Sequence, residues 1–321
     1  MAEEFFNPKP KLAISACLLG QKVRYDGGDK KATFLMETFG RHIEWVPVCP
    51  EVELGMGIPR EPVRLVGDPA KPRLIAERSG KDWTPEFESF AAKRVEALTR
   101  LDLAGYLFKK NSPSCGMERV RVYNSKGIPS LRGNGLFARA VMRGLPLLPL
   151  EEEGRLNNPA LRENFVERVF AYHRWQQLAL RRRSSSSLVS FHTTHKLLLL
   201  AHSERHYRKL GHIVAEVKQS PVTAVYEKYG QVFMEGLTIQ ATVKKHCNVL
   251  NHMMGYFSKE LSYAERQELI ALISDFRHNL VPLTVPLTLV KHYVHKYSID
   301  YLENQVYLQP SPKEFLLRNH F

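Results

Sequence analysis

The chain has 321 residues, of which 44% are hydrophobic and 25% charged, the composition of a globular protein long enough for two domains. No apolar run approaches the roughly 18 residues that a membrane-spanning helix needs, and the first residues, MAEEFF, are acidic where a secretory signal would be basic. These features exclude a membrane-spanning protein and predict a cytoplasmic one, while the net charge of +13 favours an anionic partner such as nucleic acid.

Strand and helix patterns alternate through the first half of the chain. Apolar runs predict strands at residues 12–16, 43–48, 63–67, 73–76, 104–108 and 146–150. Helical spacing of apolar residues predicts helices at 31–39, 85–101, 135–143 and 158–178. This alternation is typical of an α/β domain with a mostly parallel, Rossmann-like sheet.

The second half has mainly helical patterns, at residues 195–211, 243–257, 263–279 and 289–297. Before it, the basic triplet Arg181–Arg183 is followed by the serine run Ser184–Ser187. Such a segment is typical of a flexible linker, although a frayed helix end is the alternative. We therefore predict an α/β domain at 1–183 and a basic, all-α domain at 184–321.

Cysteine occurs only four times, and three of the four follow predicted strands. Cys17 and Cys49 come directly after the first two strands, and Cys115 lies a few residues beyond the strand at 104–108. Loops after parallel strands open on one edge of a sheet, so the three thiols are expected to converge there. Three thiolates suit an iron–sulfur cluster that keeps one iron open, whereas buried, inert thiols are the alternative. Cys247 is expected to be a plain buried thiol.

The residues around these cysteines form specific motifs: CLLG at 17–20 with RYDG at 24–27, VCPE at 48–51, and KKNSPSCG at 109–116. Together they resemble the [4Fe–4S]-dependent thiouracil desulfidase family over roughly residues 10–180. The second half resembles the helical domain often fused to that family, in FHTTHKLLLLAHS at 191–203 and NHMMGYF at 251–257. The arrangement is similar to fusion proteins that desulfurate 4-thiouridine in transfer RNA.

The resemblance implies roles for individual residues. Cys17, Cys49 and Cys115 would hold a [4Fe–4S] cluster, Glu51 would be the catalytic acid/base, and Ser112 would be a polar catalytic group at the substrate. A proton acceptor beside a sulfur-accepting iron is what the replacement of sulfur by water requires.

Three further residues are candidates for binding the substrate. Ser114 is placed to hydrogen-bond the pyrimidine edge, although a turn-capping role is equally expected. Lys109 would face phosphate or solvent, and Arg24 would position the substrate or pair with a local carboxylate.

Basic residues of the second half are candidates for RNA binding. From Phe165 onward the chain has twenty Lys and Arg against twelve Asp and Glu. Basic groups hold phosphates, and the tyrosines near them offer faces for base stacking. The alternative is a set of solvated helix faces. The predicted RNA-binding residues are Arg205, Arg208, Lys209, Lys244, Lys245, Lys291 and Lys296.

These observations favour a desulfidase that converts 4-thiouridine in thiolated transfer RNA into uridine and sulfide. Two alternatives remain open. One is a desulfidase of free thiouracil whose helical domain is a lid or a dimer contact. The other is a non-enzymatic iron–sulfur sensor that binds nucleic acid. A zinc site at His202 and His206 is not predicted, because the sequence HSERH lacks the glutamate of the HExxH motif.

Overall fold

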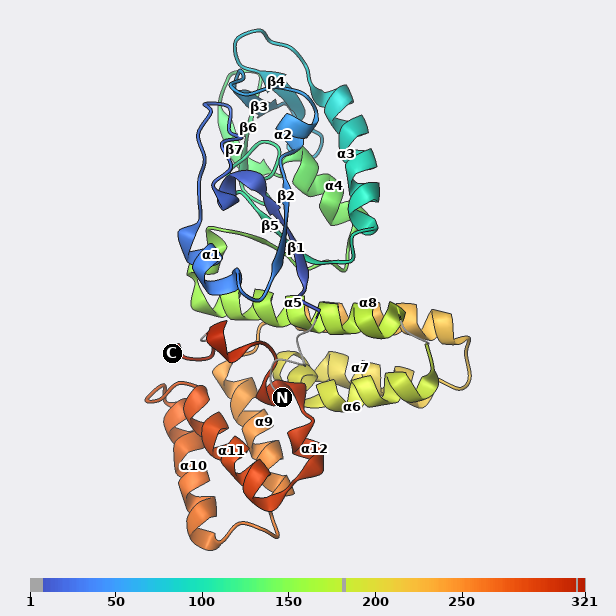
Figure 1. Ribbon diagram of the computed structural model, residues 1–321, viewed down its shortest axis with the longest axis vertical. Helices are drawn as coiled ribbons and strands as arrows, with labels where there is room; N and C mark the ends of the chain where they lie inside the picture. Colours follow the sequence, from blue (N-terminus) through green and yellow to red (C-terminus); the bar gives the residue numbers. More distant parts are fainter. Residues whose placement is uncertain (1–7, 181–182, 316, 321) are drawn as a thin grey trace. The chain divides into compact units, whose positions relative to one another are not determined.

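The computed structural model describes residues 8–180, 183–315 and 317–320. The chain forms two compact units, Met1–Asn158 and Pro159–Phe321 (Figure 1). The acidic start MAEEFF and two members of the predicted linker, Arg181 and Arg182, lie outside the described residues.

The first unit is built around a four-stranded sheet whose strands run parallel in the order β2-β1-β5-β8. The strands are β1 (Lys11–Ser15), β2 (Glu44–Val48), β5 (Leu103–Phe108) and β8 (Leu150–Glu152). The central strand β5 is buried along its whole length, which explains its continuous apolar sequence, as expected for a parallel strand covered on both faces. The predicted α/β fold with a parallel sheet is confirmed.

Helices α3 (Thr84–Thr99) and α4 (Leu136–Gly144) pack against each other beside this sheet (Figure 1). The ring of Phe137 on α4 lies 6.2 Å from that of Tyr106 on β5, centroid to centroid, and joins helix to sheet. The remaining helices of this unit are short: η2 (Ala16–Leu19), α1 (Thr33–Phe39), α2 (Pro50–Glu53) and η3 (Arg155–Asn157).

A second, mixed sheet has the order β4-β3-β6-β7. Its strands are β3 (Val63–Val66), β4 (Arg73–Ala76), β6 (Val120–Tyr123) and β7 (Pro129–Gly133). The sequence predicted β3 and β4 but not β6 and β7, whose sequences are VRVY and PSLRG.

The predicted strand at 146–150 begins too early, since β8 starts at Leu150 and ends with two buried glutamates. Glu151 is held by Arg155, and Glu152 accepts a hydrogen bond from the backbone N–H of Met117. These tertiary partners allow carboxylates to occupy a buried strand, where a hydropathy pattern does not expect them.

The second unit is helical, and the predicted all-α second domain is confirmed. None of the helices in the described ranges combines the length and the apolar character that a bilayer crossing requires. The helices of the second unit are α5 (Pro159–Leu180), α6 (Ser185–His202), α7 (Glu204–Ala215), α8 (Val222–Thr238), α9 (Val243–Tyr256), α10 (Tyr263–Arg277), α11 (Thr284–Tyr297), α12 (Asp300–Glu303), η4 (Val306–Leu308) and η5 (Lys313–Phe315).

The structure differs from the predicted organisation of this region at two capping serines, Ser184 and Ser203. Ser185–Ser187 form the first turn of α6, and the Ser184 hydroxyl accepts a hydrogen bond from the Ser187 N–H (3.1 Å). Serine favours this capping position, so the run is a helix start rather than a flexible linker. Ser203 caps α7 in the same way and divides the single helix predicted at 195–211.

The compact units divide before α5, whereas the predicted boundary at 183/184 lies after it. Trp175 of α5 stacks on Tyr229 of α8, with ring centroids 5.2 Å apart, and also contacts Phe191 of α6. This aromatic cluster groups α5 with the helices that follow it.

Candidate functional site

Three cysteines lie just beyond the carboxyl ends of three adjacent parallel strands. Cys17 is in η2, directly after β1, and η2 ends at Gly20, whose φ of +85° favours glycine. Cys49 follows β2 and occupies the N-cap position of α2, which begins with Pro50. Cys115 lies in the loop after β5. All three line one cavity of about 580 Å³, so the structure brings together the three cysteines that the sequence selected.

The loop that carries Cys115 is a tight turn closed by local hydrogen bonds. The Gly116 N–H donates to the Ser112 carbonyl oxygen (2.8 Å). A Cβ atom at Gly116 would also lie 2.8 Å from that oxygen, so glycine permits the turn. The Ser112 hydroxyl accepts from the N–H of Cys115 (3.1 Å) and of Ser114 (3.3 Å). The Ser112 hydroxyl therefore caps this turn, and Ser112 also lines the cavity.

The three thiols are desolvated. Cys17 and Cys115 are buried and Cys49 is half-buried. Burial raises the pKa of all three thiols, that of Cys17 to about 11, and the charge of Cys49 adds to the increase at the other two. Their polar contacts are weak: Cys49 Sγ lies 3.8 Å from the Val23 carbonyl oxygen, and the Ser114 hydroxyl lies 3.7 Å from Cys115 Sγ.

This donor set fits an iron–sulfur cluster. Thiolates are the ligands that iron–sulfur clusters use in proteins, and here three thiols share one cavity without forming disulfides. Among the described residues, no three His, Cys, Asp or Glu side chains are placed to hold a single metal ion. A [4Fe–4S] cluster has a different requirement. Each thiolate binds its own iron atom, so the cysteine sulfur atoms lie farther apart than three ligands of a single metal ion.

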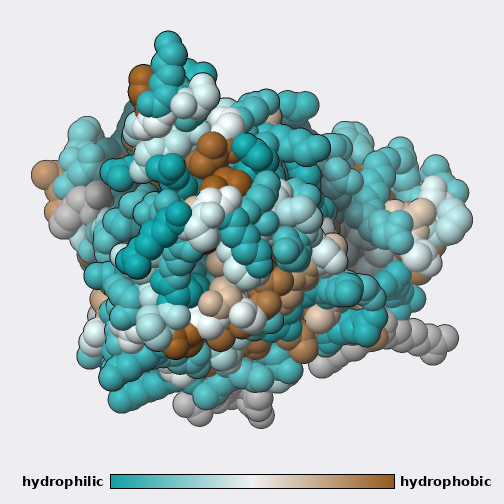
Figure 2. Space-filling view, turned by 90° about the horizontal axis from the view of Figure 1, so that it is seen from above, coloured by the Kyte–Doolittle hydropathy of each residue, from teal (hydrophilic) through white to brown (hydrophobic). Residues whose placement is uncertain are grey.

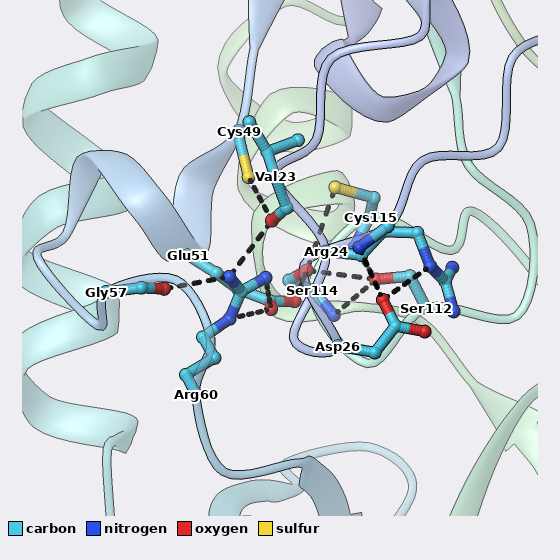
Figure 3. A network of polar contacts seen from close by, with 11 residues as sticks. Val23, Arg24, Asp26, Cys49, Glu51, Gly57, Arg60, Ser112, Ser114 and Cys115 are labelled. Atoms are coloured by element: carbon cyan, nitrogen blue, oxygen red, sulfur yellow. Dashed lines mark hydrogen bonds and ion pairs between the residues drawn. The ribbon is translucent and has the colours of Figure 1, made fainter.

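Glu51 is fixed on both of its oxygens (Figure 3). Arg60 donates to Oε2 from Nε (2.9 Å) and from Nη2 (2.5 Å), and the Ser114 hydroxyl donates to Oε1 (2.5 Å). Arg60 is itself held by the carbonyl oxygens of Val23 and Gly57. The carboxylate predicted to be the acid/base therefore lies in the cavity lining in one defined orientation. The Ser114 hydroxyl thus has a partner, Glu51, that neither of its two predicted roles named.

Arg24 and Lys109 also line the cavity, but both have acidic partners. Arg24 Nε lies 3.4 Å from Asp26 Oδ1. The Lys109 ammonium forms an ion pair with Glu153, which sequence reasoning missed. Glu153 follows a short strand that the sequence placed too early, so no pattern pointed to it.

The cavity lining is strongly basic overall. Only Glu51 and Glu77 are acidic among the described residues that line it. Its basic residues are Arg24, Lys30, Arg60, Arg64, Lys109, Lys110 and Arg121. This excess of positive charge favours an anionic ligand.

Hydrophilic residues dominate the face shown in Figure 2, and apolar residues occur on it in small separate groups. A face of this kind offers charges and hydrogen bonds rather than a large apolar docking patch.

The predicted RNA-binding residues are divided among α7, α9 and α11. Arg205, Lys209 and Lys244 are exposed and form no ion pair with another described residue. Lys245 instead donates to two backbone carbonyl oxygens, including that of His202 (2.7 Å).

The remaining three predicted RNA-binding residues are also less available. Arg208 forms an ion pair with Glu204 (2.6 Å), and Lys296 forms one with Glu265 (2.6 Å). Lys291 is half-buried, and burial lowers its pKa. Helical spacing shows which residues share a helix but not which carboxylate or carbonyl lies beside them.

Two protein-family models match parts of this chain. Residues 12–153 match the 2-thiouracil desulfurase family, and residues 196–312 match a protein family of unknown function, DUF1722. Uncharacterized protein YbgA of Escherichia coli (strain K12) is 37% identical over 153 residues, which cover 47% of this chain and 90% of YbgA. Uncharacterized protein YbbK of Bacillus subtilis (strain 168) is 30% identical over 110 residues, which cover 33% of this chain and 72% of YbbK.

One similar solved structure is that of the [4Fe-4S]-dependent thiouracil desulfidase TudS. It is 32% identical, with a TM-score of 0.39, over 48% of this chain and 97% of its own. The chain therefore belongs to the families of YbgA and YbbK, and it joins a 2-thiouracil desulfurase domain to a DUF1722 domain.

Proposed function

We propose that the cavity of the first unit is the active site of a [4Fe–4S]-dependent desulfidase that acts on a thiolated pyrimidine. The observation that carries this proposal is the shared cavity of Cys17, Cys49 and Cys115, with the carboxylate of Glu51 in the same lining. The match of residues 12–153 to the 2-thiouracil desulfurase family supports it.

In this reaction one water molecule replaces the sulfur of a thiocarbonyl group, giving a carbonyl and hydrogen sulfide. Cys17, Cys49 and Cys115 would hold the cluster, which when bound supplies a Lewis-acidic iron with affinity for sulfur. Glu51 accepts the proton of the attacking water and returns it to the departing sulfur. Arg60 and Ser114 keep the Glu51 carboxylate oriented during this exchange.

Free thiouracil is the substrate that the family match favours. A second candidate, 4-thiouridine within transfer RNA, is favoured by the excess of basic residues in the cavity lining and by the net charge of +13. A base in folded RNA would have to turn out of its stack to reach the cavity. The exposed residues Arg205, Lys209 and Lys244 would then hold RNA phosphates.

The test is anaerobic reconstitution of the full chain with iron and sulfide, followed by assays of bound iron and released sulfide. We expect wild-type protein to bind about four irons per chain and to release sulfide from 2- or 4-thiouracil. Cys17→Ser, Cys49→Ser and Cys115→Ser should each lower the bound iron, whereas Cys247→Ser, a buried free thiol of the second unit, should not. Retention of the full iron content by the first three variants would overturn the proposal.

The same preparation distinguishes the two substrates and the sensor alternative. Faster turnover of thiolated transfer RNA than of the free base would select the RNA substrate, and the reverse result would select free thiouracil. Binding of RNA without release of sulfide from any thiolated pyrimidine would favour the iron–sulfur sensor instead.

A further inference from the structure

A tyrosine on the central strand β5 carries a hydroxyl that is buried and unpaired. The side chain of Tyr106 is 0% exposed, and its hydroxyl has no hydrogen-bond partner among the described residues. A buried polar group without a partner costs free energy, so a residue of this kind calls for an explanation. Tyr106 is not one of the described residues that line the cavity of the first unit, so its hydroxyl could act on that cavity only from behind the lining.

The ring of Tyr106 packs beside the loop that carries Cys115. It stacks on Phe108, two residues along the same strand, with ring centroids 4.0 Å apart. Its other aromatic neighbour is Phe137 of α4, at 6.2 Å. The backbone N–H of Phe137 donates to the carbonyl oxygen of Ser114 (2.9 Å), the residue directly before Cys115. These contacts hold the Tyr106 ring in one place in the core.

The charged and titratable groups that influence this hydroxyl include two of the three clustered cysteines. Burial raises the pKa of Tyr106 well above its usual value, and the charges of Cys115, Glu53 and Cys49 raise it further, while Arg94 opposes them. The hydroxyl therefore keeps its proton and can serve as a donor. Glu53 is already engaged, because its Oε1 accepts from the Cys49 N–H (3.0 Å) and its Oε2 lies 2.7 Å from Arg94 Nε. The cysteine sulfur atoms are the remaining acceptors.

Cys115 is the most deeply buried of the candidate ligands and has few donors. The Ser114 hydroxyl lies 3.7 Å from its Sγ, but the single proton of this hydroxyl goes to Glu51 (2.5 Å). Burial raises the pKa of the Cys115 thiol, and the Ser15 hydroxyl opposes this increase by hydrogen bonding. A thiolate at this depth needs donors to replace the water that it loses, and a sulfur ligand of an iron–sulfur cluster can accept several hydrogen bonds.

We propose that Tyr106 is a positioning residue whose hydroxyl donates a hydrogen bond to the Cys115 thiolate when that sulfur binds iron. This inference rests on the proposed function, because it requires a cluster at the three cysteines. An ionised sulfur would supply the acceptor that the hydroxyl otherwise lacks. Charge-assisted hydrogen bonds are roughly twice as strong as neutral ones, and partners of this kind orient metal ligands and adjust the properties of the metal.

Tyr106→Phe tests the proposal, because it removes the hydroxyl, keeps the ring and gives different expectations without and with iron. In the iron-free full chain the hydroxyl is an unpaired buried group, so the midpoint of urea unfolding should be equal to that of wild type or higher. In the reconstituted protein the donor to the thiolate is lost, and we expect iron to pass to a chelator about tenfold faster. A purely structural role would instead destabilise both forms.

The reduction potential of the reconstituted protein is a second measurement. Hydrogen bonds to the sulfur atoms of a cluster stabilise its more negative, reduced state, so the potential of Tyr106→Phe should be more negative than that of wild type. The matched control is Tyr263→Phe, which removes a 79% exposed hydroxyl on α10. It should match wild type in unfolding midpoint, iron loss and potential.

The outcomes separate this inference from the proposed function. Reconstituted wild-type protein that holds no iron would overturn both. If wild type binds about four irons, the proposed cluster stands, and equal iron loss and an equal potential in Tyr106→Phe would overturn only the role of Tyr106. A lower unfolding midpoint of the iron-free variant, or its failure to fold, would also overturn that role, because the hydroxyl would then already have a partner in the iron-free fold.

Discussion

The Ser114 hydroxyl donates a 2.5 Å hydrogen bond to Oε1 of Glu51, although 63 residues separate them in the sequence. The bond joins the loop after β5 to the helix after β2. Arg60 donates to the other oxygen, Oε2, and the two contacts together hold the Glu51 carboxylate in one orientation. The same loop carries Cys115, so one short turn connects a candidate cluster ligand with the candidate acid/base.

Substitution Ser114→Ala tests this connection. It removes the donor to Oε1, and hydrogen bonds to charged groups contribute about 1.5–3 kcal/mol, so we expect kcat to fall roughly ten- to a hundredfold. Bound iron and the visible absorbance of the reconstituted protein should stay at the wild-type level. Ser125→Ala, in an exposed turn, is the matched control. An unchanged kcat would show that Ser114 does not position Glu51.

Substitution Glu51→Gln tests the acid/base itself. A positioned acid/base contributes about 10²–10⁴-fold to a rate, so sulfide release should fall by at least about a hundredfold. The amide still fills the space of the carboxylate, and we expect iron content to be retained. Glu88→Gln, on the exposed face of α3, should behave as wild type. Wild-type turnover by an iron-loaded Glu51→Gln protein would refute the assigned role.

The pKa of Glu163 predicts a pH dependence of stability in the second unit. The folded value is raised to about 7 from 4.5, mainly by burial and then by Glu167. Between these values the folded state binds more protons than the unfolded state, so the contribution of Glu163 to stability falls as pH rises from about 4.5 to 7. The opposite shift of Glu167, to about 2 beside Arg318, acts only as pH falls below about 4.5.

Glu163→Gln removes this titration. From pH 5 to pH 8, the free energy of unfolding should fall by about 1–3 kcal/mol more in the wild type than in Glu163→Gln. Urea unfolding followed by tryptophan fluorescence measures it in a Trp45→Phe, Trp83→Phe background, where Trp175 alone reports on the second unit. Parallel pH profiles of the two proteins would contradict the prediction.

The RNA proposal predicts an effect that depends on salt. Replacing Arg205, Lys209 and Lys244 together by Ala should weaken transfer RNA binding at least about tenfold and reduce the slope of log K against log salt by roughly 2–3. Turnover of free thiouracil should not change, because these residues lie outside the cavity of the first unit. Fluorescence anisotropy at several salt concentrations provides the measurement.

The control for this experiment removes the same amount of charge elsewhere. Lys218, Lys228 and Lys259 are exposed residues of the second unit that the sequence did not single out. If both triple variants lose the same affinity, net charge rather than a defined RNA surface is responsible.

Local sequence patterns predicted much of the fold. The helices α1, α3, α9 and α10 and the strands β3 and β4 lie within about two residues of their predicted ranges, because each has a clear period of apolar residues. The helix α8 and the strands β6 and β7 were missed. The break at Ser203 was hidden because a helical period continues across it, and only the cap of α7 interrupts the helix there.

The sequence by itself determined the parallel sheet, the three cysteines at its strand ends and the basic character of the chain, because the alternation of strand and helix patterns, the positions of the cysteines and the charge are all present in the sequence itself. Only the tertiary structure decided which groups meet. Contacts of this kind are those of Arg60 and Ser114 with Glu51, of Glu153 with Lys109, and of Arg318 with Glu163, which is 155 residues away. A buried charge depends on a partner that the folded chain brings from elsewhere, and no local pattern names that partner.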